Sequence, residues 1–295
     1  MSQLDSKMSK DLNELYHQGQ ISDAVSLDNA GIICSPFSTK GKPGYYTGNR
    51  NANTVVVALN PGIESSEADN NYSNAILPAQ KWHSNQSSKW NDFSSYYNSF
   101  MDLSDNAGTY DINRLDYFDL KPDAFLKEWP ECGINIPNAF PEKKDTYLAA
   151  KAAAMNEKLQ LELIPYASQK FRIKKGADYR FLFPYLEMVF NEIISEERSF
   201  VIFAAGVFES IFKAYNQDST TNGVIDLSNP VQKTADPLKK GGRIKGRCRV
   251  IHITYKGNSF KAIIAHSYAS YALHYAIYRM RDYGRFCYDV FKKTP

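Results

Sequence analysis

The sequence lacks several features that would identify a protein class at once. Its four cysteines are far apart and form no CxxC pair, so a zinc or iron–sulfur site has little support. It has no run of about 18 apolar residues, and its polar N-terminus carries no apolar signal region. The formal net charge is only +3, so overall charge does not indicate a polyanionic partner. We expect a soluble, cytoplasmic protein with no metal and no membrane contact.

Several enzyme signatures are also missing. The chain has no nucleophile elbow, no phosphate-binding glycine-rich loop and no dinucleotide fingerprint, and it contains no internal repeat. These absences leave little support for a small-molecule α/β hydrolase or nucleotide-processing enzyme, and we expect no cofactor. Hydrophobic residues make up 43% of the 295 residues, enough for a sizeable core. The sequence therefore predicts a single domain over residues 1–295, with its core at about 50–290.

Strand and helix patterns alternate along the chain. Apolar runs predict strands at residues 54–59, 160–165, 200–206, 250–255 and 260–265, the last two forming a hairpin around Lys256-Gly257-Asn258-Ser259. Helical patterns cover residues 7–18, 146–159, 179–197, 207–215 and 268–291. Residues 63–144 are expected to be an aromatic and polar insertion that serves as a lid or binding loop, and residues 216–247 a basic, mobile loop. This order predicts an α/β fold with a mostly parallel sheet covered on both faces.

Two of the predicted strands end in a polar side chain. Residues 54–62 run from β-branched residues into Asn60-Pro61-Gly62, and residues 260–267 deliver His266 and then Ser267. Open α/β sheets place ligand sites at the carboxyl ends of their strands, which makes Asn60 and His266 candidate catalytic residues. The alternatives are that Asn-Pro-Gly is only a turn and that His266 is a structural residue.

These strand ends resemble those of the uracil-DNA glycosylase superfamily. The similarity rests on Asn60-Pro61-Gly62, on the strand end at residues 161–165, on Ala204-Ala205-Gly206 and on His266-Ser267. Asn-Pro-Gly resembles the mismatch-specific and single-strand-selective monofunctional branches. The latter have His-Pro-Ser, whereas here His266 is followed directly by Ser267. The resemblance implies a three-layer αβα fold with a four-stranded central sheet.

The resemblance also implies a reaction. Asn60 would hold the water that attacks the sugar, and His266 would donate a hydrogen bond to the pyrimidine O2 as negative charge develops there. No lysine is identified that could form a Schiff base, which favours simple hydrolysis to an abasic site. Pro61, Gly62 and Ser267 would line the substrate site beside these two residues.

Glu162 indicates which base is recognised. The family reads the flipped pyrimidine with an Asn at the second strand end, and counting back from Pro165 places Glu162 there. An ionised Glu only accepts hydrogen bonds, so it would repel the O4 of uracil and favour the amino group of cytosine. The alternative is a slipped alignment in which Glu162 is a solvent-facing strand residue. Because ordinary cytosine must be spared, the substrate would be a modified cytosine, and hydroxymethylated or glucosylated cytosine of phage DNA would imply antiviral defence.

Other residues are candidates for contacting the flipped base or the DNA. Aromatic residues of the insertion, among them Tyr72 and Phe93, could stack on the base, although most insertion aromatics are expected to anchor a lid. The residues after the histidine correspond to the family's DNA-intercalating loop and include Tyr268, Ser270 and Tyr271. Phosphate contacts are expected from Lys239, Lys240, Arg243, Lys245, Arg247 and Arg249, although charge runs are commonly solvated faces.

The sequence thus predicts a monomeric DNA glycosylase that excises a modified cytosine. Two other functions stay open. One is a uracil or mismatch repair glycosylase, and the other is a non-catalytic DNA-binding protein of the same fold.

Overall fold

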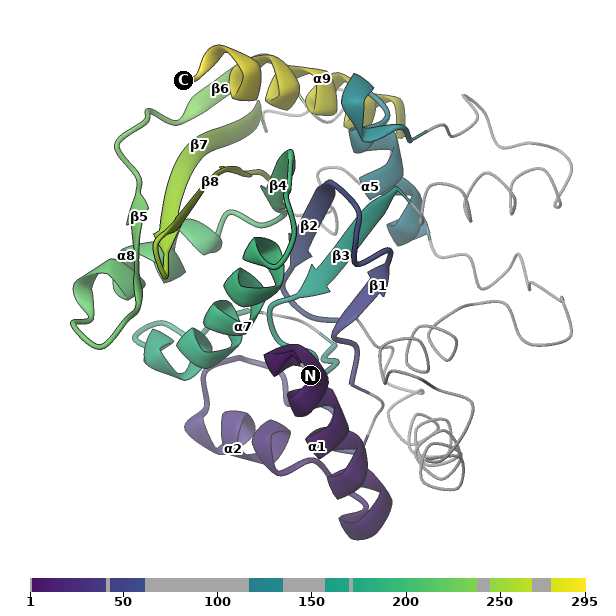
Figure 1. Ribbon diagram of the computed structural model, residues 1–295, viewed down its shortest axis with the longest axis vertical. Coiled ribbons are helices and arrows are strands. Elements are labelled where there is room, and N and C mark those ends of the chain that lie inside the picture. The colour runs from purple at the N-terminus through teal and green to yellow at the C-terminus, as the bar shows by residue number, and fades with distance from the viewer. Residues whose placement is uncertain are drawn as a thin grey trace, which may run out of the picture. The chain divides into compact units, whose positions relative to one another are not determined.

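The computed structural model describes residues 2–40, 43–61, 117–134, 157–169, 172–237, 245–266 and 277–295 (Figure 1). The chain divides into two compact units. The first unit consists of Met1–Thr47, Leu59–Ser104 and Leu161–Ser195, and the second unit of Gly48–Ala58, Asp105–Gln160 and Glu196–Pro295.

The strands form a mixed sheet. They are β1 (Tyr46–Gly48), β2 (Thr54–Ala58), β3 (Lys158–Glu162), β4 (Phe200–Phe203), β5 (Gly223–Asp226), β6 (Gln232–Pro237), β7 (Lys245–Tyr255) and β8 (Asn258–Ile264). Their order is β1-β3-β2-β4-β8-β7-β5, and β6 also pairs with β7. The pairs β2–β4 and β4–β8 are parallel, whereas β7 is antiparallel to β8, β5 and β6. The α/β class is confirmed, but the expected four-stranded sheet is not.

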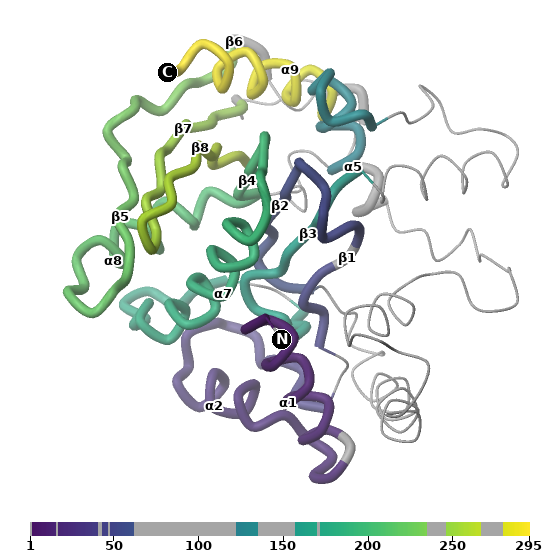
Figure 2. Tube along the Cα trace, viewed as in Figure 1, coloured from purple at the N-terminus to yellow at the C-terminus, as the bar shows by residue number. Residues whose placement is uncertain are grey.

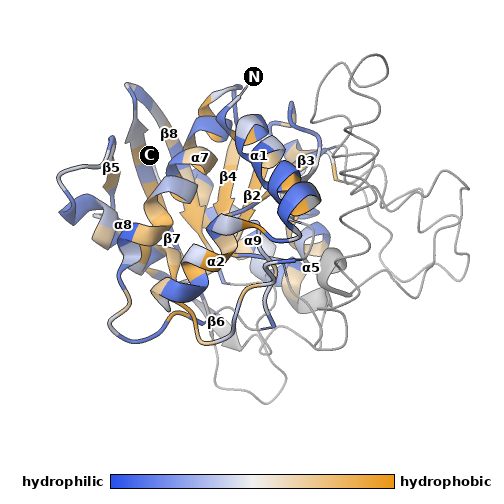
Figure 3. Cartoon of the chain, turned by 90° about the horizontal axis from the view of Figure 1, so that it is seen from below, coloured by the Kyte–Doolittle hydropathy of each residue, from blue (hydrophilic) through white to orange (hydrophobic). Residues whose placement is uncertain are grey.

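In the second unit, helices cover both faces of the sheet. Phe200 and Ile202 of β4 belong to a buried cluster with residues of α5 (Tyr117–Leu126) and α9 (Ile277–Lys293), which pack together (Figure 1). Phe203 points to the opposite face, where its ring contacts Phe208 and Phe212 of α8 (Phe208–Gln217). Apart from Thr54, strands β2 and β4 consist of hydrophobic residues, as their orange colour in Figure 3 shows, because both of their faces are buried. Helices therefore pack against both faces of β4.

The predicted hairpin is present as β7 and β8 (Figure 2). Its turn consists of Lys256 and Gly257, which have positive φ angles of 49° and 79°. Two-residue hairpin loops favour this backbone because its twist matches that of the strands, and glycine adopts it without steric cost.

The structure differs from two expectations about loops. Residues 216–247 were expected to be a mobile loop, but they contain β5, β6 and the first residues of β7. Both β5 and β6 pair with β7, and Ile225 is the buried residue of β5, so these strands need few apolar residues. Within the expected lid at 63–144, α5 and Trp129 belong to the buried core of the second unit. Strand β3 also begins at Lys158, inside the range predicted to be helical.

The first unit is built on helices. It contains α1 (Gln3–Gln18), α2 (Ser22–Ala30), the 3₁₀ turn η3 (Tyr179–Leu182) and α7 (Phe183–Ile194), which confirm the helical patterns at 7–18 and 179–197. Helix α1 begins at a capping box between Ser2 and Asp5 and ends at Gly19, whose φ is 70°. Its buried residues Leu4, Met8, Leu12 and Leu15 recur at helical spacing. No helix in the described ranges is long and apolar enough to cross a membrane.

Candidate active site

Three strands of the second unit end at the same level of the sheet. Val57 of β2 pairs with Phe203 of β4, and Phe203 pairs with Ile264 of β8. Parallel hydrogen bonds continue this row, from Ala204 N to Val57 O (2.8 Å) and from Ala265 N to Phe203 O (2.9 Å). The sequence motifs at Asn60, Gly206 and His266 each follow one of these strands within three residues.

Asn60 lies in the first unit, where its side-chain orientation is fixed. Its Nδ2 lies within hydrogen-bond distance of the carbonyl oxygens of Pro61 (3.0 Å) and Tyr166 (3.0 Å) and of Oγ of Ser168 (2.9 Å), so its two hydrogens are shared among three acceptors. A flipped amide would place Oδ1 against two carbonyl oxygens, which it cannot bond. No described residue donates to Oδ1. The half-buried side chain can therefore accept a hydrogen bond from a water or a ligand.

The backbone around Asn60 is held by the loop that follows β3. Ile164 N donates to Leu59 O (2.9 Å), and Ser168 N donates to Pro61 O (3.1 Å). Gly44 N donates to Pro165 O in the same loop (2.6 Å), and a Cβ at Gly44 would lie only 2.8 Å from Cγ of Pro61. The Asn-Pro turn is thus hydrogen-bonded to the loop after β3, and Gly44 leaves no room for a side chain beside Pro61.

Glu162 ends β3 and is buried, with 9% of its surface exposed. Its backbone N–H donates to Tyr45 O at 3.0 Å. The interpretation of Glu162 as a solvent-facing strand residue is therefore wrong.

His266 follows β8 in the second unit, where Tyr283 of α9 holds its backbone. The His266 N–H donates to the Tyr283 hydroxyl (2.8 Å), which donates in turn to the carbonyl oxygen of Arg247 in β7 (2.7 Å). The register pairs Arg249 with Ile264, so its continuation places Arg247 opposite His266. The hydroxyl therefore stands where a direct ladder hydrogen bond would form, and it separates the strands at this point.

Tyr283 is suited to this bridging role. Burial raises the pKa of its hydroxyl well above the ordinary value of 10.0, so the group stays protonated and can both donate and accept. Its ring lies 5.5 Å from that of Phe125 and 5.8 Å from that of His266 between centroids. The sequence showed only a helix rich in tyrosine, and no local signal distinguished Tyr283 from its neighbours.

The two described arginines among the predicted DNA contacts differ in their surroundings. Arg247 is exposed, and its Nη2 would lie 3.4 Å from a Cβ built on Gly206, so its guanidinium lies beside the end of β4. Arg249 is only 16% exposed; it pairs with Glu209 (3.4 Å) and donates to Leu227 O (2.7 Å). Arg247 is available for a ligand, whereas Arg249 is used within the protein.

Three basic residues of α9 also have partners inside the second unit. Arg281 and Arg285 both bind Glu128, at 2.8 and 2.7 Å. Lys292 pairs with Glu131 at 2.7 Å. These pairs join α9 to the segment that follows α5.

Several predicted site residues lie outside the described residues. They are Gly62, Tyr72, Phe93, Lys239, Lys240, Arg243, Ser267, Tyr268, Ser270 and Tyr271, and of Lys245 only the backbone position in β7 is described. Among the described residues, no three His, Cys, Asp or Glu side chains form a group that could hold a metal ion.

The fold and these residues define a mixed α/β protein with polar motifs at the carboxyl ends of its parallel strands. Comparisons with models of protein families, with curated proteins and with solved structures found no match to this chain.

Proposed function

We propose that this protein is a monofunctional DNA glycosylase that hydrolyses the N-glycosidic bond of a flipped, modified pyrimidine. The observation that carries the proposal is the shared row of Val57, Phe203 and Ile264, because the strands through this row lead directly to the motifs at Asn60, Gly206 and His266. Ligand sites of α/β sheets lie outside such strand ends.

The fixed amide of Asn60 supports its proposed role. With Nδ2 bound to protein oxygens, Oδ1 can accept a hydrogen bond from water and hold it for attack on C1′ of the deoxyribose. The water oxygen bonds to C1′ as the bond to the base breaks. The base leaves with the bonding electrons and takes up the proton that the water releases, which gives the free base and an abasic site. An amide is a weaker activator than a carboxylate, so a slow enzyme or a good leaving group is expected.

His266 would stabilise the departing base. A neutral imidazole can donate one hydrogen bond to the pyrimidine O2 as charge gathers there. Removing such a donor typically lowers the rate by about a hundredfold or more. The backbone bond to Tyr283 supports this role, since a charge-stabilising donor must be positioned before the reaction.

The position of Glu162 at the end of β3 supports its role as the reader of the base, and in its ionised form it would favour a cytosine-derived base over uracil. A buried carboxylate can accept from the exocyclic amino group of cytosine, whereas the O4 of uracil offers no proton. A modification must then distinguish the substrate from ordinary cytosine. We propose 5-hydroxymethylated or glucosylated cytosine, as in phage DNA, which would give the enzyme a role in antiviral defence.

Incubation of the protein with single- and double-stranded oligonucleotides tests this function. The strands carry uracil, cytosine, 5-hydroxymethylcytosine or glucosylated 5-hydroxymethylcytosine, and released base and alkali-labile sites are measured. We expect release of a modified cytosine, reduced about a hundredfold or more in Asn60→Ala and His266→Ala. Rapid release of uracil would exclude the cytosine assignment. DNA binding without release of any base would instead favour the non-catalytic alternative.

A further inference from the structure

A buried acid lies on the apolar side of the first helix. Asp11 of α1 is fully buried, next to the stripe formed by Leu4, Met8, Leu12 and Leu15. Its Oδ2 accepts hydrogen bonds from the hydroxyls of Tyr45 (2.5 Å) and Tyr166 (2.7 Å), and its Oδ1 accepts one from Nζ of Lys7. Burying a carboxyl group costs free energy even when it is bonded, and burial raises the pKa of Asp11 above its ordinary value of 3.8.

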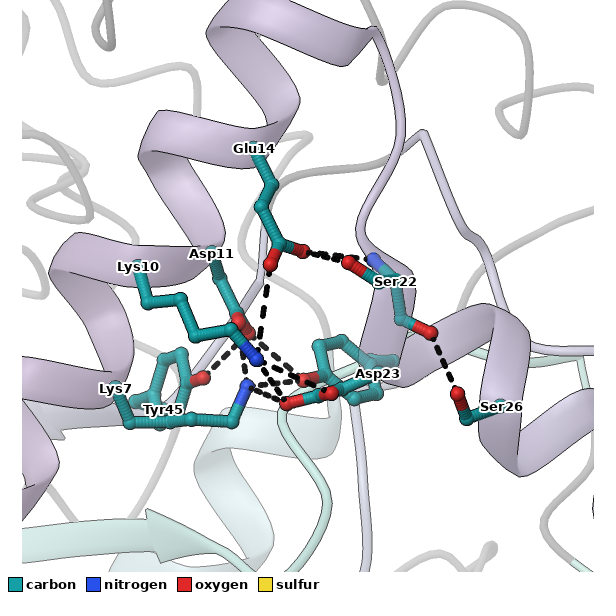
Figure 4. A network of polar contacts seen from close by, with 9 residues as sticks. Lys7, Lys10, Asp11, Glu14, Ser22, Asp23, Ser26 and Tyr45 are labelled. Atoms are coloured by element: carbon teal, nitrogen blue, oxygen red, sulfur yellow. Dashed lines mark hydrogen bonds and ion pairs between the residues drawn. The ribbon is translucent and has the colours of Figure 1, made fainter.

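Charged groups of α1 and α2 complete this network, as Figure 4 shows. Nζ of Lys7 also pairs with Asp23 (2.8 Å) and donates to the hydroxyl of Tyr166 (2.8 Å). Lys10 pairs with Asp23 at 3.2 Å. An apolar residue in place of Asp11 would avoid the cost of this burial, so stability alone does not explain the arrangement.

Tyr166 connects this network to Asn60. Its hydroxyl is held by Asp11 and Lys7, and its ring packs edge-on against Phe37 (6.3 Å between centroids) and Tyr185 (6.1 Å). Its backbone oxygen accepts the hydrogen bond from Nδ2 of Asn60 at 3.0 Å. The residue that is anchored by its side chain thus orients the Asn60 amide with its backbone.

We propose that Asp11 and Tyr166 are positioning residues for Asn60, so that helix α1 is part of the apparatus that orients the candidate catalytic amide. The importance of this orientation for catalysis rests on the proposed glycosylase function. The orientation itself is a property of the folded chain and can be measured without a substrate.

Two matched substitutions test the proposal. Tyr166→Phe and Tyr45→Phe each remove one buried hydroxyl from the same Asp11 oxygen, but only Tyr166 contacts Asn60. The side-chain amide signals of Asn60 are followed by NMR and assigned by their loss in Asn60→Asp. We expect Tyr166→Phe to shift these signals and to accelerate exchange of the Asn60 amide hydrogens with solvent about tenfold, which corresponds to the loss of roughly one hydrogen bond. Tyr45→Phe should leave the signals and the exchange rate unchanged. Equal effects of both variants, or none in Tyr166→Phe, would overturn the proposal.

Turnover provides the second measurement. Misplacement of a reacting group by about 1 Å can lower kcat a hundredfold, so Tyr166→Phe is expected to lower kcat between about tenfold and a hundredfold with KM unchanged. Tyr45→Phe should retain the wild-type kcat, and a kcat loss shared by both variants would indicate a stability effect only. If the wild-type protein releases no base from any DNA, the proposed function fails, and the NMR result still decides whether Asp11 and Tyr166 position Asn60.

Discussion

Substitution of Tyr283 by Phe removes a single oxygen atom that joins two strands. That oxygen accepts from the His266 N–H at 2.8 Å and donates to Arg247 O at 2.7 Å. Each hydrogen bond contributes about 1 kcal/mol net, and a backbone group left buried without a partner costs about 1–3 kcal/mol. If the strands stay apart, the free energy of unfolding should therefore fall by about 2–3 kcal/mol.

The strands could instead close to restore a direct bond between His266 and Arg247. The N–H and the carbonyl oxygen would have to approach to about 2.9 Å, which draws His266 toward β7. The loss of stability would then be below about 1 kcal/mol, but His266 would leave its position. We expect the strands to stay apart, because the ring of residue 283 remains packed against Phe125 and Phe286.

Urea denaturation and amide hydrogen exchange distinguish these outcomes. We expect Tyr283→Phe to lower stability by about 2 kcal/mol and to accelerate exchange of the His266 N–H. Tyr288→Phe is the control, because this tyrosine lies on the same helix but its hydroxyl bonds to the carboxylate of Glu131. A change in stability below about 0.5 kcal/mol with unaltered exchange at His266 would refute the reasoning.

Four further substitutions test the packing and charge assignments. Gly284→Ala would place a Cβ 2.1 Å from the backbone oxygen of Phe125, so we expect a loss of about 3 kcal/mol or more in thermal or urea unfolding. Burial raises the pKa of Glu128, but its two arginine partners outweigh this and hold the pKa below the ordinary 4.5. The contribution of Glu128 to stability is present above pH 4.5 and is lost as the pH falls through the lowered pKa. We therefore expect Glu128→Gln to lower the free energy of unfolding by about 1 kcal/mol at pH 7 and to make the melting temperature fall less steeply at acid pH. Arg247→Ala should weaken DNA binding and reduce the slope of log binding constant against log salt concentration by about one, without altering stability. Arg249→Ala should instead lower the free energy of unfolding by about 2 kcal/mol.

Each of these expectations has a result that would contradict it. An unchanged melting temperature in Gly284→Ala would show that α5 and α9 do not approach as described, and Asp289→Ala on the exposed side of α9 serves as its control. If the melting temperature of Glu128→Gln falls with decreasing pH as steeply as that of the wild type, the ion pairs of Glu128 do not contribute to stability. Identical behaviour of the two arginine variants in binding and in stability would argue against their separate assignments.

Much of the fold could be predicted because its signals are local. The buried strands β2 and β4 are continuous apolar runs, and the hairpin turn at Lys256-Gly257 carries glycine where a positive φ is required. Strands β5 and β6 could not be predicted, because both are held by pairing with β7, and their sequences resemble a polar loop. The packing of Trp129 depends on distant residues such as Phe200 and Phe291, which no local pattern reveals.

The features of the candidate site also divide into those that the sequence determined and those that the tertiary structure decided. The sequence by itself determined the residue types and their positions after apolar runs, because strand propensity and turn chemistry are properties of neighbouring residues. Only the tertiary structure decided that Asn60 has one amide orientation, that Glu162 is buried and that Tyr283 holds His266. These facts depend on hydrogen bonds between residues far apart in the chain, such as Asn60 with Tyr166. Their partners become neighbours only when the chain has folded.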